Sequence, residues 1–272
     1  MKALIDGDIL RYEVGFGAES GWRAITGREE VPPFEYVQEL LDTRLAQIMH
    51  TTSSQDYEFY ITEGKTFRFD IAKTAPYKGT RKEKKPFHFD NLTLIMKMCY
   101  NTKVCQGLEA DDYLAIDALQ RDGERIICSR DKDLRQVPGL FYSWELGKQP
   151  GFGPTRIEPM GHIELTNDRR TVKGTGYAFF CAQLLMGDRA DNIPDTANID
   201  PVKTSDLLAP IISTTPEKDF YDTIDKAVAD CYLESYGDKA DETLLEQGRL
   251  LWLVRRLNPD GSPVLWERGM RE

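Results

Sequence analysis

The sequence predicts an α/β protein built on a parallel sheet flanked by helices. Short apolar segments alternate with segments of helical periodicity between residues 2 and 144, and such alternation is typical of a parallel sheet with helices on both faces. Acidic residues directly follow several of the apolar segments, at the edge where these sheets bind ligands. We expect an α/β domain over residues 1–172 and a helical region over residues 173–272.

The first elements follow from apolar spacing. Residues 2–6 are a short apolar run that predicts a strand, and residues 33–50 place apolar side chains at helical spacing. A second strand is expected over residues 57–61. Residues 63–90 contain Gly64, Pro76, Gly79 and Pro86 with little periodicity, which predicts a long functional loop.

Regular alternation returns after this loop. Strands are predicted over residues 103–105, 125–129 and 140–144. Residues 147–171 are rich in Gly and Pro and are expected to be irregular. Helical spacing predicts helices over residues 91–100, 110–121, 177–186, 203–208, 218–236 and 241–257.

Composition narrows the class of protein. The net charge of −10 and pI near 5.0 argue against a polyanionic partner, but basic residues concentrate between Lys78 and Lys85. No apolar run reaches the roughly 20 residues of a membrane helix. Five cysteines without any CxxC pair suggest neither a disulfide framework nor a zinc site. We therefore expect a cytoplasmic protein with no membrane partner.

Carboxylates gather in short clusters after the predicted strands. Each cluster alone could be a helix cap or a turn, but several at one sheet edge favour binding of divalent cations. Oxygen ligands without nearby His or Cys select Mg²⁺ or Mn²⁺, and two such ions can hydrolyse a phosphodiester. The candidate metal ligands are Asp6, Glu63, Glu109, Asp111, Asp112, Asp131, Asp133, Asp188 and Asp191, with Asp8 beside the first.

The basic stretch suits the phosphates of a nucleic acid. Its cations could contact phosphates and offset charge in the transition state, and an aromatic side chain there could stack on a base. A merely solvated loop is the alternative interpretation. The candidate DNA-binding residues in this region are Arg68, Tyr77, Lys78, Arg81, Lys82, Lys84 and Lys85.

Five ordered motifs resemble those of the 5′→3′ exonuclease and flap endonuclease family. They are Asp-Gly-Asp from residue 6, Tyr-Lys-Gly-Thr-Arg from residue 77, Glu-Ala-Asp-Asp from residue 109, Ser-Arg-Asp-Lys-Asp from residue 129 and Gly-Asp-Arg-Ala-Asp-Asn-Ile-Pro from residue 187. The resemblance covers residues 2 to about 209. The C-terminal region, with Glu246-Gln247-Gly248-Arg249, looks most like phage members. The resemblance implies a PIN-like domain, two metal ions, a basic arch over residues 63–90 and a helical DNA-binding motif.

The resemblance also implies roles for residues. Lys78 and Arg81 match arch residues at the scissile phosphate and count, with Asp111, as the catalytic candidates. Glu63 stands where the family usually has Asp. The first ion would be held or oriented by Asp6, Glu109, Asp111 and Asp131, and the second held or supported by Asp112, Asp133, Asp188 and Asp191.

One segment departs from the family pattern. Residues 195–202 lack the glycines of a hairpin that grips duplex phosphates, often with a potassium ion, although Lys203 and Thr204 keep a DNA-binding helix start. Without glycine the backbone adopts tight anion-binding turns less easily. A potassium site and a firm grip on duplex DNA are therefore doubtful.

The function expected from the sequence is a 5′→3′ exonuclease and flap endonuclease. Its partner would be DNA with a 5′ end or 5′ flap, in replication or in primer or DNA degradation, and the enzyme would be a monomer, in the host cytoplasm if phage-encoded. A PIN-type ribonuclease or RNA–DNA hybrid nuclease is the first alternative. A silent nucleic-acid-binding module ranks lower, because no acidic position of the motifs is neutralised.

Overall fold

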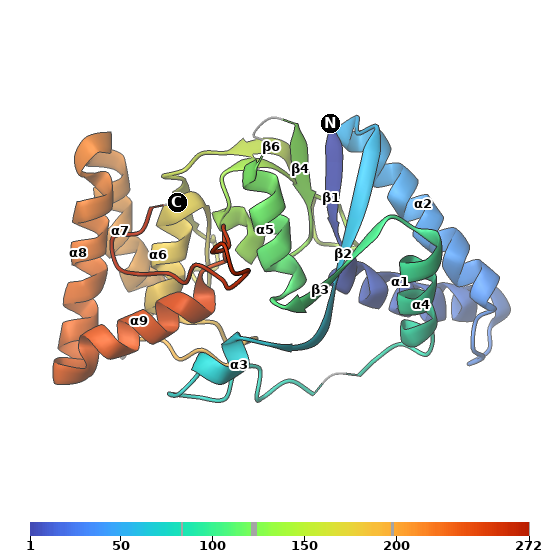
Figure 1. Cartoon of the computed structure of the whole chain (residues 1–272), viewed down its shortest axis with the longest axis horizontal. Helices are drawn as coiled ribbons and strands as arrows, with labels where there is room; N and C mark the ends of the chain where they lie inside the picture. Colours follow the sequence, from blue (N-terminus) through green and yellow to red (C-terminus); the bar gives the residue numbers. More distant parts are fainter. Residues whose placement is uncertain (83, 121–123, 197–198, 272) are drawn as a thin grey trace. The chain divides into compact units, whose positions relative to one another are not determined.

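A computed structural model describes residues 1–82, 84–120, 124–196 and 199–271 (Figure 1). The chain divides into two compact units. The first unit comprises Met1–Gly64, Lys82–Asp131 and Gly139–Arg156, and the second comprises Lys65–Arg81, Lys132–Pro138 and Ile157–Glu272. The units thus alternate along the sequence, whereas the predicted domains meet at a single boundary.

The described residues of the first unit form a six-stranded sheet in the order β3-β2-β1-β4-β5-β6. β1 pairs in parallel with β2 and with β4, and β4 pairs in parallel with β5. The predicted parallel sheet is confirmed, and the carboxyl ends of these strands share one edge. The strands are β1 (Lys2–Asp6), β2 (Asp56–Thr66), β3 (Thr102–Gly107), β4 (Arg125–Cys128), β5 (Gly139–Ser143) and β6 (Phe152–Ile157).

Helices cover both faces of this sheet. One face lies against α1 (Gly7–Thr26), α2 (Phe34–Thr52) and α4 (Phe89–Cys99), in a core that includes Leu10 and Phe59. Side chains alternate along a strand, so Tyr60 points to the opposite face from Phe59. There its hydroxyl donates to Asp117 Oδ2 of α5 (Ala110–Gln120) at 2.7 Å. This packing sets the start of α5 at the carboxyl edge.

Helix α1 is absent from the sequence-based predictions. It contains four glycines, each of which disfavours a helix by about 1 kcal/mol relative to Ala. Two of them are required by packing: a Cβ at Gly7 would lie 2.6 Å from Ile61 Cγ2, and one at Gly15 would overlap Pro86. Tertiary packing on the sheet therefore outweighs low local propensity.

The second unit is mainly helical and surrounds α6 (Gly176–Met186). Every residue of α6 from Gly176 to Leu185 is buried. β7 (His162–Leu165) and β8 (Val172–Thr175) form an antiparallel pair. β6 and β7 both lie within residues 147–171, so the prediction of an irregular segment is wrong for these two strands. The predicted last helix ends at Leu251. The remaining elements are α3 (Arg68–Ile71), the 3₁₀ turns η1 (Asp133–Gln136) and η2 (Gly237–Lys239), α7 (Pro201–Thr214), α8 (Glu217–Tyr236) and α9 (Ala240–Leu251).

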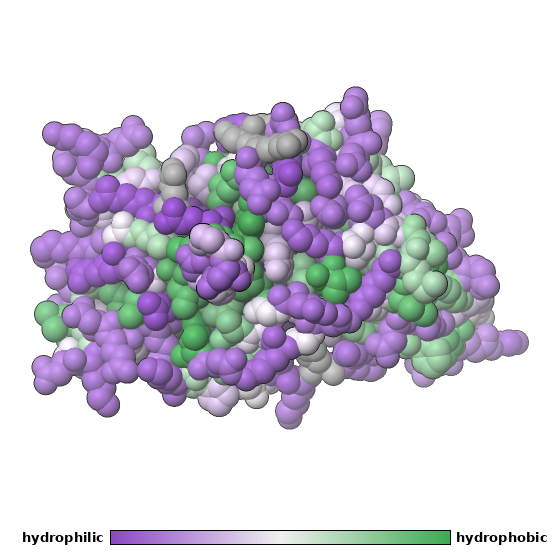
Figure 2. All heavy atoms as spheres, in the orientation of Figure 1, coloured by the Kyte–Doolittle hydropathy of each residue, from purple (hydrophilic) through white to green (hydrophobic). Residues whose placement is uncertain are grey.

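The surface is largely hydrophilic on the face drawn in Figure 2, with smaller apolar areas between the polar ones. Charged residues make up 29% of the chain, which is consistent with a largely hydrophilic surface. Within the described part of the chain, none of the helices is long and apolar enough to cross a membrane.

Gly248 provides a test of the packing in the second unit. A methyl group at this position of α9 would overlap the Trp266 indole ring, so Gly248→Ala should lower the free energy of unfolding by about 1–3 kcal/mol. Gly17→Ala in α1 is the matched control, since nothing lies within 4 Å of its added Cβ and alanine favours a helix. Urea unfolding would contradict this packing if both variants changed stability alike.

Candidate active site

Five carboxylates of the first unit come from segments that begin at the carboxyl ends of strands. Asp6 ends β1 and Asp8 opens α1, while Glu109 and Asp111 lie at the start of α5 and Asp131 follows β4. Parallel strands bring these ends to one edge of the sheet. We call Asp6, Asp8, Glu109, Asp111 and Asp131 the edge carboxylates.

Asp6 is the most constrained of the edge carboxylates. Its side chain is 1% exposed; Oδ1 accepts the Ile9 amide at 3.0 Å, and Oδ2 accepts the Ser129 hydroxyl at 2.6 Å. Burial, followed by the charges of Asp8 and Asp131, raises its pKa to about 7 despite these hydrogen bonds, which lower it. The site therefore holds an acid that ionises near neutral pH.

Asp111 responds to the same neighbours. Burial raises its pKa well above the usual value, and the charges of Asp6, Asp131 and Glu109 raise it further. The four carboxylates are thus close enough to destabilise one another when ionised. Bound cations would relieve this repulsion.

Asp112 and Glu63 have other partners. Asp112 is fully buried, and its Oδ2 accepts the Glu109 amide at 3.1 Å at the start of α5. Glu63 is exposed within β2, where Lys97 forms an ion pair with it and Gln106 Nε2 donates to Oε2 at 3.0 Å. The hydrogen bonds from Lys97 and Gln106 lower the pKa of Glu63. In this structure, therefore, Asp112 supports α5 and Glu63 neutralises Lys97.

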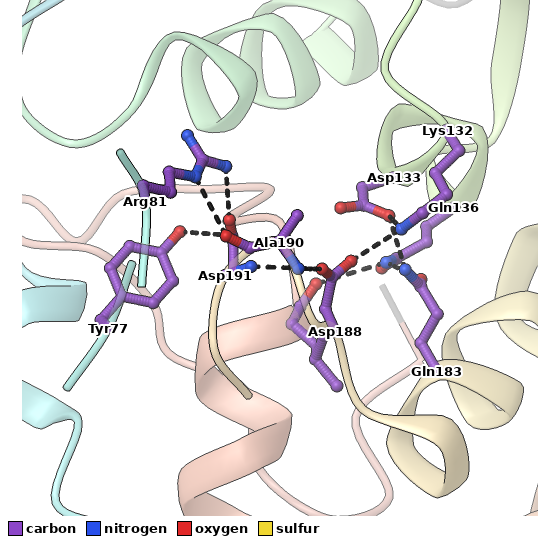
Figure 3. A network of polar contacts seen from close by, with 10 residues as sticks. Tyr77, Arg81, Lys132, Asp133, Gln136, Gln183, Asp188, Ala190 and Asp191 are labelled. Atoms are coloured by element: carbon purple, nitrogen blue, oxygen red, sulfur yellow. Dashed lines mark hydrogen bonds and ion pairs between the residues drawn. The ribbon is translucent and has the colours of Figure 1, made fainter. Parts of the chain in front are cut away.

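The second unit brings a further acidic group together (Figure 3). Lys132 Nζ lies 2.7 Å from both Asp133 Oδ1 and Asp188 Oδ2. Burial lowers the pKa of Lys132, but the charges of Asp133 and Asp188 outweigh it and raise the pKa overall. Burial likewise raises the pKa of Asp188, but Lys132 outweighs it and the net shift is downward. Asp133 and Asp188 together thus form a position that already attracts a cation.

The loop from Asp188 to Ile193 is folded around the Asp188 side chain. Its Oδ1 accepts the amides of Ala190 at 2.7 Å and Asp191 at 3.2 Å. Asp188 and Ile193 also exchange backbone hydrogen bonds. This local geometry fixes Asp188 and presents Asp191 on the next turn.

Asp191 fastens the base of the predicted arch to this loop (Figure 3). Tyr77 Oη donates to Asp191 Oδ2 at 2.8 Å, and Arg81 Nη2 donates to Oδ1 at 2.6 Å. The amide of Lys78 donates to the Asp191 carbonyl at 2.9 Å. The carboxylate predicted as a metal ligand is therefore engaged with two predicted DNA-binding side chains.

Two predicted DNA contacts occupy buried positions. Arg68 is 1% exposed and donates from Nε and Nη2 to the carbonyls of Leu250 and Trp252 at 3.0 and 2.9 Å. Tyr77 is 4% exposed, and its ring lies edge-on against Phe69. Neither placement matches the expected phosphate contact or base stacking. Both side chains instead anchor the segment to the second unit.

The other basic residues are more accessible. Lys82, Lys84 and Lys85 are exposed, as is Arg81, while Lys78 is half-buried with a positive φ of 54°. Residue 83 lies outside the described residues. This stretch keeps the charge and exposure required for phosphate contact.

Glu246 of α9 holds the same segment and is not among the sequence-predicted site residues. Its Oε1 accepts the amides of Lys73 and Thr74, each at 2.7 Å, and its Oε2 accepts the Thr74 hydroxyl at 2.9 Å. The Glu-Gln-Gly-Arg motif is the signal that points to it. α9 thus anchors the start of the basic segment.

The beginning of α7 carries the predicted DNA-binding pair. Asp200 caps the helix by accepting the Lys203 amide at 2.9 Å, and Pro201 occupies its first turn. Lys203 is exposed, whereas Thr204 is fully buried and so does not face a ligand. Residues 197 and 198 of the glycine-poor segment lie outside the described residues.

A divalent ion such as Mg²⁺ needs several oxygen ligands around it. Among the described residues, no three His, Cys, Asp or Glu side chains are already arranged to coordinate a metal ion. The chemistry and charge of the edge carboxylates nevertheless fit a divalent ion, because these side chains offer only oxygen atoms and repel one another. Asp133 and Asp188 fit as well, since Lys132 already links them as a cation.

Structural comparison identifies the fold as that of known 5′-nucleases. A bacteriophage T5 flap endonuclease in a product complex with DNA and metal ions is 14% identical, with a TM-score of 0.55 over 92% of this chain and 98% of that one. The T5 5′-exonuclease with bound zinc ions is 15% identical, with a TM-score of 0.51 over 93% and 100%. No protein-family model and no curated protein sequence matches the chain.

The raised pKa of Asp6 predicts a pH dependence of stability. Because its pKa of about 7 in the folded protein exceeds the ordinary 3.8, the folded state binds the proton more tightly. The contribution of Asp6 to the free energy of unfolding should therefore fall as pH rises from about 4 to about 7, and then level off. Urea unfolding in EDTA at several pH values measures this.

Asp6→Asn is the control for this dependence. Asparagine also caps helices well, so the Ile9 hydrogen bond is retained while the ionising group is removed. The pH dependence should be smaller in Asp6→Asn than in wild type. Identical dependence in the two proteins would contradict the assignment to Asp6.

Proposed function

We propose that this protein is a divalent-metal-dependent DNA nuclease that acts on 5′ ends and 5′ flaps. The observation that carries the proposal is the set of mutually repelling edge carboxylates at the carboxyl edge of a parallel sheet, of which Asp6 and Glu109 are buried. Support comes from the fold shared with the T5 flap endonuclease that was solved with DNA and metal ions. Mg²⁺ or Mn²⁺ suits an all-oxygen donor set.

The proposed ligands follow from the two acidic groups. Asp6, Glu109, Asp111 and Asp131 would hold the first ion, and Asp133 and Asp188 the second. Bound ions would activate a water and stabilise the leaving oxygen. Asp112 supports the first group by capping α5, and Asp191 acts by holding the base of the arch.

The chain's cations would bind the substrate. Lys78 and Arg81 flank the base of the arch, and Lys82, Lys84 and Lys85 continue it as exposed positive charges. They would contact phosphates and balance charge that develops at the scissile one. Lys203 at the start of α7 would contribute a further phosphate contact. We propose DNA as substrate because the chain shares its fold with the T5 flap endonuclease that was solved with DNA; an RNA–DNA hybrid is compatible with the same chemistry.

A PIN-type ribonuclease is the second candidate function. The acidic sheet edge favours it equally, since the chemistry at the phosphate is the same for both nucleic acids. Cleavage of matched DNA and RNA single strands by the wild-type protein distinguishes the two. The proposed pathway, replication or DNA degradation by a phage-encoded enzyme in the host cytoplasm, depends on DNA being the substrate.

Removal of one carboxylate tests the metal assignment. Asp111→Asn and Asp131→Asn should each lower the rate of DNA cleavage by at least about 100-fold, because each removes a proposed metal ligand, and even changes to residues that only hydrogen-bond to ligands cost about 10- to 100-fold. DNA binding measured in Ca²⁺ should change little, because neither change removes a cation. Glu58→Gln, on β2 and paired with Lys2, is the control. Full activity in both variants would refute the assignment.

A further inference from the structure

Gln183 places an amide side chain in a buried and largely apolar helix. It is 2% exposed in α6, whose sequence is GYAFFCAQLLM. Burying an amide is unfavourable unless its donors and acceptor find partners. A leucine or methionine would suit the core at lower cost. The contacts of this amide therefore indicate what it does.

Both ends of the Gln183 amide are engaged (Figure 3). Nε2 donates to Asp133 Oδ1 at 2.5 Å, and Oε1 accepts from Gln136 Nε2 at 2.5 Å. Gln136 is itself fully buried, and its backbone carbonyl accepts Arg255 Nη2 at 3.0 Å. Hydrogen bonds thus connect the buried Gln136 side chain, through Gln183, to the half-buried Asp133 carboxylate.

An amide N–H is a suitable hydrogen-bond donor to a carboxylate that binds a metal ion. Asp133 Oδ1 also lies 2.7 Å from Lys132 Nζ, which reaches Asp188. A lysine orients a carboxylate but neutralises it and competes with a bound cation. An uncharged amide orients the carboxylate and leaves its negative charge available.

We propose that Gln183 is a positioning residue that fixes Asp133 for the second divalent ion. This inference rests on the proposed function, because it takes Asp133 and Asp188 as ligands of that ion. Gln136 contributes indirectly by holding the Gln183 oxygen and so the direction of its Nε2–H bond. Asp133, Gln136 and Gln183 all belong to the second unit.

The test measures Mn²⁺ binding by electron paramagnetic resonance without DNA. Gln183→Met removes the amide while keeping side-chain length and core packing. One of the two Mn²⁺ ions should bind about 10- to 100-fold more weakly, and the affinity of the other should stay unchanged. Cleavage by the variant should recover as Mn²⁺ is raised, because the missing step is ligand orientation.

Gln247→Met is the matched control. Gln247 is a fully buried amide of the same unit that accepts the Tyr232 hydroxyl. The Gln247→Met variant should bind both Mn²⁺ ions as wild type does, even if urea unfolding shows that it loses as much stability as Gln183→Met. Should Gln183→Met not fold, Gln136→Met should give a smaller weakening of the same ion.

The outcomes separate the two claims. Wild type that binds two Mn²⁺ ions and cuts DNA, with unchanged Mn²⁺ binding in Gln183→Met, would overturn the positioning role alone. Equal weakening in Gln183→Met and Gln247→Met would do the same. Wild type that binds no Mn²⁺ and cuts no DNA would overturn the proposed function, and this inference with it.

Discussion

Repulsion among the edge carboxylates is the constraint on which the proposed site depends. Asp6 receives hydrogen bonds from the start of α1 and from Ser129, yet its pKa still rises to about 7. These two hydrogen bonds therefore do not compensate for the burial of the Asp6 carboxylate and for the charges of Asp8 and Asp131. A stable fold tolerates this cost when a ligand of opposite charge offsets it. The same repulsion that penalises the folded state would thus favour binding of a divalent ion.

The second unit deals with its acidic residues in a different way. Lys132 forms ion pairs with both Asp133 and Asp188, and Tyr77 and Arg81 donate hydrogen bonds to Asp191. The arch base is thereby held to the loop that carries Asp188, while Glu246 and the buried Arg68 fasten it to α9 and the residues that follow. Beyond this anchored base, Lys82, Lys84 and Lys85 are exposed.

The parallel sheet and its acidic edge can be predicted from the spacing of apolar residues and from the way parallel strands align. Acidic residues placed directly after apolar segments are visible along the chain, and parallel strands bring them to one edge. Helix α1 escapes prediction because its four glycines lower helix propensity while the sheet supplies the stabilising contacts. Arg68 and Leu250 are 182 residues apart, and Gln136 and Gln183 are 47 apart. Such partners depend on the folded core, so sequence spacing cannot reveal that Arg68 is buried or that Gln183 reaches Asp133.

Cleavage of a 5′-flap DNA by the wild-type protein tests the central claim most directly. The flap strand would be labelled at either end and incubated with Mg²⁺, with Mn²⁺ or with EDTA, alongside RNA of the same sequence. The proposed function predicts products released from the 5′ side of the DNA in either metal ion and none in EDTA. Cleavage that persists in EDTA, or DNA that stays intact in both metal ions, would contradict it.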